Sequence, residues 1–151
     1  MQLRAGSFLK STNALDGSFF EQTIIFIKEY NDDGAVGLMI NRPFCRSLNE
    51  LEEFSQSLSF PLYHGGPVDE EHLFFLHRRP DVITGTTPVS DDIYWGGDFE
   101  KAVQGINQQV LTAGDIKIFV GYCGWNAGDL EAEIEEGSWT VLDADSATVF
   151  R

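Results

Sequence analysis

The residue types best suited to chemistry in this 151-residue chain lie in the segment 121–131, Gly-Tyr-Cys-Gly-Trp-Asn-Ala-Gly-Asp-Leu-Glu, which follows an apolar run at 116–120. A glycine turn that leads from a buried strand into a helix would place Cys123 near the helix N-terminus, where the helix dipole favours a thiolate. Cys123 is therefore a candidate nucleophile, with His64 or His77 as its base and the N–H groups of the turn as an oxyanion site. The alternative is a small buried side chain at a crowded turn.

Two further loops could bind an anion. The turn at 65–68, Gly-Gly-Pro-Val, can cradle an anion with its N–H groups, although the same residues also make an ordinary reversal. In Asn41-Arg42-Pro43, the asparagine can cap a turn and the arginine can hold a carboxylate or phosphate through two parallel hydrogen bonds. If these loops meet segment 121–131, one pocket for a small anionic ligand would be lined by Asn41, Arg42, His64, Gly65, Gly66 and Trp125.

The common motifs of nucleotide, metal and serine-hydrolase enzymes do not occur. The chain contains no G-x-x-x-x-G-K-[ST], no G-x-G-x-x-G after a strand, no H-E-x-x-H and no G-x-S-x-G. Two cysteines without C-x-x-C spacing and three histidines do not predict a zinc site. The carboxylates of segment 129–136 suit a solvated helix face better than a cation site. We therefore expect neither a metal nor a cofactor.

The charge balance is strongly acidic, with 24 Asp and Glu against 10 Lys and Arg and a formal net charge of −14. Such a surface repels nucleic-acid phosphates and anionic lipid, so direct binding to nucleic acid or to a membrane is disfavoured. A protein partner, a small-molecule anion and a homo-oligomer all stay open. Two distant cysteines, with no apolar run near the roughly 18 residues of a spanning helix, predict a cytoplasmic protein with free thiols.

The apolar pattern predicts mostly short buried strands. Residues 23–27 and 35–40 are continuous apolar runs joined by a turn at 31–34, Asn-Asp-Asp-Gly, and they predict a hairpin. Segment 121–125 is expected to interrupt the strand at 116–120. Further strands are predicted near residue 63 and at 73–77, 82–86 and 139–142.

Three helices are predicted among these strands. Ser47 and Glu50 stand in capping-box relation, and the apolar residues at 48, 51, 54 and 58 continue at helical spacing until Pro61. Asp98 is a good N-cap for a second helix, which we expect to end at Ala113-Gly114. A short acidic helix is expected over 128–136. The order of elements predicts a single α+β domain, with a mixed and strongly curled sheet and helices packed outside it.

Several short motifs, kept in order along nearly the whole chain, resemble one family of bacterial proteins. The most specific block runs from Gly121-Tyr122 through Gly124-Trp125 and Gly128 to Glu133-Ile134. On these motifs the chain is similar to the AlgH family, also called YqgE-like or UPF0301. The other matching positions are Gly34-Ala35, Gly37-Leu38, Asn41-Arg42-Pro43, Gly65-Gly66-Pro67-Val68 and Leu76-His77.

The resemblance implies a fold more clearly than a chemistry. It implies one domain over residues 1–151, with a bifurcated or barrel-like mixed sheet surrounded by helices. Members usually run longer and add a C-terminal helix, so this chain is expected to lack that helix and to leave its apolar end at 147–150 uncovered. The family is labelled as transcriptional regulators, and it has no agreed active site to carry over. Cys123 and Asp129 depart from the expected pattern, which weighs against Cys123 as a shared nucleophile.

Three hypotheses on function follow. The leading one is a non-enzymatic binding or regulatory protein that acts on transcription indirectly, through a protein partner. The alternative is a small enzyme or an anion-binding protein that uses the glycine turns with Arg42, His64, His77 and Cys123. A scaffolding role in an oligomer is the third.

Overall fold

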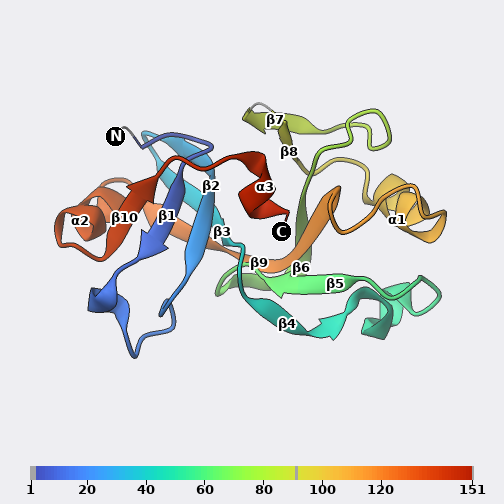
Figure 1. The fold of residues 1–151 in the computed structure, drawn as a ribbon, viewed down its shortest axis with the longest axis horizontal. Coiled ribbons are helices and arrows are strands. Elements are labelled where there is room, and N and C mark those ends of the chain that lie inside the picture. The colour runs from blue at the N-terminus through green and yellow to red at the C-terminus, as the bar shows by residue number, and fades with distance from the viewer. Residues whose placement is uncertain (1–2, 91, 151) are drawn as a thin grey trace.

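A single long strand, β9 (Ile116–Asn126), runs through the middle of the molecule and joins its two halves (Figure 1). The computed structural model describes residues 3–90 and 92–150. The strands form a curled sheet in the order β10-β1-β2-β3-β9-β6-β8-β7, and β4 and β5 branch from β9. Neighbouring strands are antiparallel except β5 and β9, which are parallel. The predicted α+β fold with a mixed, curled sheet is confirmed.

The two halves use different parts of the chain. The half at the left of Figure 1 contains β1 (Phe8–Ser11), β2 (Ile24–Asn31), β3 (Gly34–Met39), β10 (Trp139–Leu142) and α2 (Asp129–Glu135). The other half contains β4 (Pro43–Ser47), β5 (Pro61–His64), β6 (Val68–His77), β7 (Thr87–Ser90), β8 (Ile93–Trp95) and α1 (Phe99–Asn107). The last helix, α3 (Ser146–Val149), lies between them. The 3-10 turns are η1 (Asn13–Leu15), η2 (Leu48–Glu50) and η3 (Glu52–Phe54).

Elements with strong local signals appear where the sequence predicts them. β2 and β3 form the predicted hairpin, with Asn31 opposite Gly34 across the turn. Asp98 caps α1, because its carboxylate accepts hydrogen bonds from two N–H groups of the first turn. The acidic helix α2 and the strand β10 are also confirmed.

The helix predicted after Ser47 is wrong. The capping contact exists, since the Glu50 carboxylate accepts from the Ser47 N–H at 3.0 Å. The chain then makes two 3-10 turns, η2 and η3, separated by an extended Leu51 (φ −84°, ψ 135°). The apolar residues at 48, 51 and 54 are spaced by three, which matches the 3-10 period better than the 3.6-residue period of an α-helix.

Two predicted boundaries in the same half are also wrong. Residues 82–86 form no strand, because the N–H groups of Val82 and Ile83 both bond back to the Arg79 carbonyl in a turn. The strands lie later, at β7 and β8. Helix α1 ends at Asn107, well before Gly114, and Gln109 just after it takes a positive φ of 60°.

The interruption predicted at Gly121 does not occur. β9 continues to Asn126, because its second part pairs with β3, with Gly37 opposite Cys123 and Ala35 opposite Trp125. Gly121 has a φ of +74°, and a Cβ there would lie 2.3 Å from the Gly66 carbonyl oxygen. The glycines thus allow two backbones to cross in direct contact while the strand bends.

In the described part of the chain, the buried core contains three clusters, and the central one connects the two halves. In it, Phe8 and Phe26 of the first half meet Leu76 of the second half and Phe119 of β9. The end of the chain completes this cluster: Val149 is fully buried and Phe150 is 8% exposed. The expected uncovered end at 147–150 is therefore wrong, because α3 folds back onto the sheet. Within residues 3–90 and 92–150, no helix is both long and apolar enough to cross a membrane.

Candidate functional site

Asn41 and Arg42 bind the protein's own backbone. The Asn41 side chain accepts from the Ile24 N–H and donates to the Gln22 carbonyl, both at 3.0 Å. The Arg42 guanidinium donates to the Phe19 carbonyl at 2.6 Å and to the Thr23 hydroxyl at 2.9 Å. These contacts hold the loop before β2 in place. They use N–H donors of Asn41 and Arg42 that an anionic ligand would need.

His64 is held in an aromatic setting beside this loop. Its Nε2 lies 2.9 Å from the Glu70 carboxylate. Its ring centroid lies 5.6 Å from that of Phe19 and 6.3 Å from that of Phe44. The thiol of Cys123 bonds the Gly65 carbonyl and not His64, so the observed partner of the imidazole is a carboxylate and not a nucleophile.

His77 is fully buried in the other half and has a structural hydrogen-bond pattern. Its Nδ1 accepts from the Arg79 N–H at 3.0 Å. The proton therefore sits on Nε2, which donates to Thr86 Oγ1 at 2.9 Å and to the Gly96 carbonyl at 3.1 Å. Burial lowers the pKa of His77, so the ring stays neutral. It joins β6 to the segment after β8.

Cys123 lies in strand β9, and its expected position near a helix N-terminus is wrong. The side chain is 2% exposed, and its thiol donates to the Gly65 carbonyl at 3.4 Å. Burial raises the pKa of Cys123 to about 12. The thiol therefore stays protonated near neutral pH, which does not fit an activated nucleophile.

The predicted residues come together only in part. The Gly65 carbonyl accepts from the Met39 N–H as well as from Cys123, and the His64 N–H donates to the Arg42 carbonyl. This region, which we call the crossing, consists of Asn41, Arg42, His64, Gly65, Gly66, Gly121 and Cys123. Backbone contact fills it. Trp125 points elsewhere: its indole N–H shares the Glu133 carboxylate with that of Trp139.

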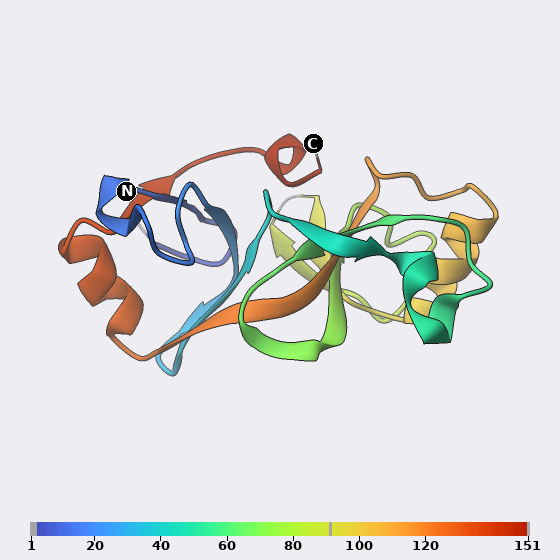
Figure 2. The ribbon, with the colours of Figure 1, turned by 90° about the horizontal axis from the view of Figure 1, so that it is seen from below.

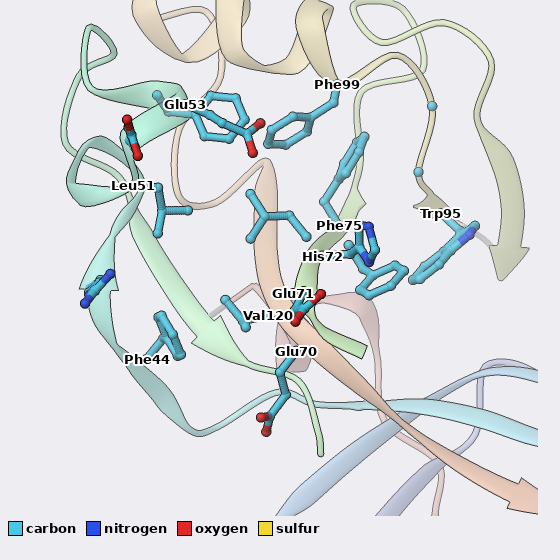
Figure 3. A pocket seen from close by; sticks show the side chains of 17 residues that line it. Phe44, Leu51, Glu53, Glu70, Glu71, His72, Phe75, Trp95, Phe99 and Val120 are labelled. Carbon is cyan, nitrogen blue, oxygen red and sulfur yellow. The ribbon is translucent and has the colours of Figure 1, made fainter. Parts of the chain in front are cut away.

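A large groove lies instead in the half of the molecule that contains α1. It has a volume of about 980 Å³. Figure 3 shows Val120 of β9 and Phe75 of β6 at its floor, with Phe44 on one side and Trp95 and Phe99 on the other. The rings also contact one another: between ring centroids, Phe99 lies 5.3 Å from Phe75, and Phe74 lies 5.8 Å from Trp95. The apolar lining comprises Phe44, Leu51, Phe54, Leu73, Phe74, Phe75, Trp95, Phe99 and Val120.

Four exposed carboxylates also line this groove, and we call them the acidic rim: Glu52, Glu53, Glu70 and Glu71. Two of them come from η3 and two from β6. Arg46 and His72 are the basic side chains among the lining residues. The rim therefore has an excess of negative charge beside aromatic surface.

A bulge in β6 carries half of the acidic rim. Val68 pairs with Tyr122 and Leu73 pairs with Val120, so residues 69–72 stand opposite Gly121 alone. Figure 2 shows this part of β6 curling away from β9. The extra residues cannot stay in the regular pleat, and three of them, Glu70, Glu71 and His72, line the groove. His72 in the bulge hydrogen-bonds Asp69 at 2.5 Å, which raises the pKa of the imidazole.

The groove is not among the sites predicted from the sequence. Residues 73–77 are predicted only as a short buried strand, and nothing in the sequence indicates that acidic residues of η3 and β6 line one groove. Two glutamates at 70 and 71, followed closely by two phenylalanines at 74 and 75, were the available signal, but their meaning depends on the bulge. Among the described residues, no group of three or more His, Cys, Asp or Glu is arranged to hold a metal ion.

Lys117, which no sequence motif singles out, is 5% exposed. Its ammonium donates to the carbonyls of Ile40 at 2.5 Å and Val149 at 2.9 Å, and it lies 4.1 Å from the centroid of the Tyr63 ring. Burial lowers the pKa of Lys117 to about 8. These contacts tie α3 to the end of β3, so the lysine has a structural role.

Comparison with known proteins agrees with this architecture. The family model described as AlgH-like matches residues 8–151. The UPF0301 protein CT0663 of Chlorobaculum tepidum is 40% identical over 146 residues, which cover 94% of this chain and 75% of the relative. A UPF0301 protein of Chlorobium luteolum is 40% identical over 149 residues, covering 99% of this chain and 79% of the relative.

Solved structures show the same fold. The solution structure of AlgH from Pseudomonas aeruginosa superimposes with a TM-score of 0.78 at 28% identity, covering 99% of this chain and 85% of that one. The crystal structure of DIP2367 from Corynebacterium diphtheriae gives a TM-score of 0.79 at 18% identity, with 99% and 81% covered, and this likeness concerns the fold alone. Matched by the family model over nearly its whole length and by relatives at 40% identity, the chain belongs to the AlgH-like family of UPF0301 proteins.

Proposed function

We propose that this protein is a non-enzymatic binding protein whose groove takes a cationic partner that also has apolar parts. The observation that carries the proposal is the combination of an aromatic groove of about 980 Å³ with the acidic rim. Half-buried aromatic rings offer apolar contact area, and their faces attract cations. Carboxylates at the rim select for positive charge, which the net charge of −14 reinforces at longer range.

The crossing gives less support to the enzymatic or anion-binding alternative. Arg42 already binds backbone carbonyls, His77 is buried and neutral, and Cys123 is a buried thiol with a raised pKa. The groove is equally unsuited to an anion, because the acidic rim would repel it. A regulatory effect on transcription would then pass through a basic protein partner, since a surface of this charge disfavours direct contact with DNA.

The test measures binding of a synthetic peptide of alternating lysine and leucine by isothermal titration calorimetry at low salt. The double variant Glu53→Gln/Glu71→Gln removes two charges of the acidic rim. We expect it to weaken binding by about tenfold, because each exposed ion pair contributes up to ~1 kcal/mol.

A matched control removes the same charge elsewhere. The double variant Glu135→Gln/Glu136→Gln changes exposed residues of α2 and its end, far along the chain from the groove lining. It should bind the peptide within about twofold of the parent protein. Equal weakening by both double variants would show that net charge, and not the groove, determines binding. Failure of the peptide to bind at all would contradict the proposed function.

A further inference from the structure

The groove does not end at its lining, because aromatic rings continue from it across the surface. Phe44 at the edge of the groove lies 6.3 Å from His64, and His64 lies 5.6 Å from Phe19, measured between ring centroids. Glu70 belongs to the acidic rim and also bonds His64 at 2.9 Å, so the rim and these rings are in direct contact. We call Phe44, His64 and Phe19 the ladder.

The far end of the ladder is an exposed aromatic side chain that is held in place. Phe19 is 46% exposed, among the most exposed large apolar side chains of the described chain. The Arg42 guanidinium lies 4.9 Å from its ring centroid and donates to its carbonyl at 2.6 Å. Phe20 also contacts the ring edge to face at 5.1 Å. A fixed ring loses little conformational freedom when a partner covers it, which is the usual property of a binding anchor.

The charges along this surface change from one end to the other. Carboxylates flank the groove, whereas at the ladder's far end the Arg42 charge is already engaged by backbone carbonyls and by the Thr23 hydroxyl. A partner that fits both ends therefore needs basic groups over the acidic rim and an apolar group over Phe19. The two ring-to-ring steps of the ladder correspond to roughly four residues of extended chain at the rise of a β-strand.

We infer that the occupant of the groove is an extended basic segment of a partner protein, which continues along the ladder and places an apolar side chain on Phe19. The inference rests on the proposed function and names the class of partner. A free amine would fill the groove and leave the ladder uncovered. A protein segment covers both, and it adds the apolar contact that a free amine lacks.

The test compares two peptides on the protein and on two variants. The short peptide alternates lysine and leucine and is long enough for the groove alone; the long peptide adds a neutral spacer and a terminal leucine that can reach Phe19. The variant Phe19→Ala removes the anchor. The matched control, Leu58→Ala, removes a side chain of 45% exposure that lies outside the groove lining and the ladder.

We expect Phe19→Ala to lower the affinity for the long peptide by about tenfold, the usual size of an anchor effect, and to leave the affinity for the short peptide unchanged. Leu58→Ala should change neither. A thermal unfolding curve checks that both variants fold, and Phe19→Leu, which keeps apolar contact, should restore most of the affinity.

The results that would overturn the inference differ from those that would overturn the proposed function. The inference about the ladder is wrong if the short and long peptides bind with equal affinity, or if Phe19→Ala leaves the affinity for the long peptide unchanged. Either result is still compatible with binding in the groove. Spermidine binding as tightly as the long peptide identifies the partner as a free amine and also overturns the inference. If no basic probe binds, both ideas fail.

Discussion

The crossing and the groove differ in what satisfies their polar groups. At the crossing, the guanidinium of Arg42 and the thiol of Cys123 find partners in the protein's own backbone. In the groove, the carboxylates of Glu53 and Glu71 are exposed beside half-buried rings, and neither forms a salt bridge with another of the described residues. Reactive residue types thus identify a site only when the fold leaves them unsatisfied and facing open space.

Thiol labelling gives the largest expected difference and tests the crossing directly. Cys45 is exposed in β4, whereas Cys123 is buried and has a pKa raised to about 12. At pH 8 only about one Cys123 side chain in ten thousand is ionised, and it is also shielded from reagent. We expect iodoacetamide to label Cys123 more than about a thousandfold more slowly than Cys45, as measured by mass spectrometry of the peptides.

The Cys45→Ser variant serves as the control for this measurement, because it should take up no label until denaturant is added. Rapid modification of Cys123 in the folded protein would show that its thiol is reactive and would contradict this prediction.

Backbone contact at the crossing predicts a large loss of stability on adding one methyl group. Gly121→Ala would put a Cβ 2.3 Å from a carbonyl oxygen at a φ of +74°. We expect the free energy of unfolding to fall by about 3 kcal/mol or more, measured by urea denaturation.

Gly128→Ala separates backbone strain from the clash. Gly128 has a similar φ of +85°, but no atom lies within 4 Å of the position of its Cβ. It should cost only about 1 kcal/mol, the ordinary penalty of a left-handed conformation for alanine. Similar losses for the two variants would mean that the close approach of Gly121 to the Gly66 carbonyl contributes nothing.

The smallest expected effect concerns protonation in the groove. His72 faces Asp69, with Glu71 and Glu53 also near, and its hydrogen bond to Asp69 raises the imidazole pKa. Because the pKa of His72 is raised above its ordinary value of about 6.5, the imidazole takes up its proton at a higher pH than a free histidine does. The added positive charge opposes a cationic ligand.

We therefore expect affinity for the lysine–leucine peptide to fall by about twofold to threefold between pH 8 and pH 6. His72→Gln should flatten this dependence. Calorimetric titrations of both proteins at the two pH values provide the comparison, and an identical slope for the variant would assign the effect to another group.

Prediction from sequence succeeded where short-range signals were decisive. Asp98 caps α1, Asn31 and Gly34 close the hairpin, and β10 has the predicted bounds, because a cap or a tight turn is determined by a few neighbouring residues. It failed where distant parts of the chain decide. The sequence of Gly121–Trp125 is typical of a turn, yet the segment is part of β9 because it pairs with β3. In place of the helix expected after Ser47, the chain forms 3-10 turns packed on the core.

For the candidate site, the sequence left open whether the loops at Asn41, Gly65 and Gly121 meet. In the structure they lie together, and backbone contact fills the place of the pocket considered there. The groove could not be predicted, because its walls come from η3, the β6 bulge and the start of α1, which only the folded sheet brings together.

By itself, the sequence determined the family, the α+β class, the acidic surface and the locally coded turns and caps. These follow from residue type and from hydrogen bonds that span a few residues. The tertiary structure decided which polar groups are used up and which face open space, because that depends on surfaces far apart in the chain. Arg42 and Cys123 became structural, and four ordinary glutamates became the rim of a groove.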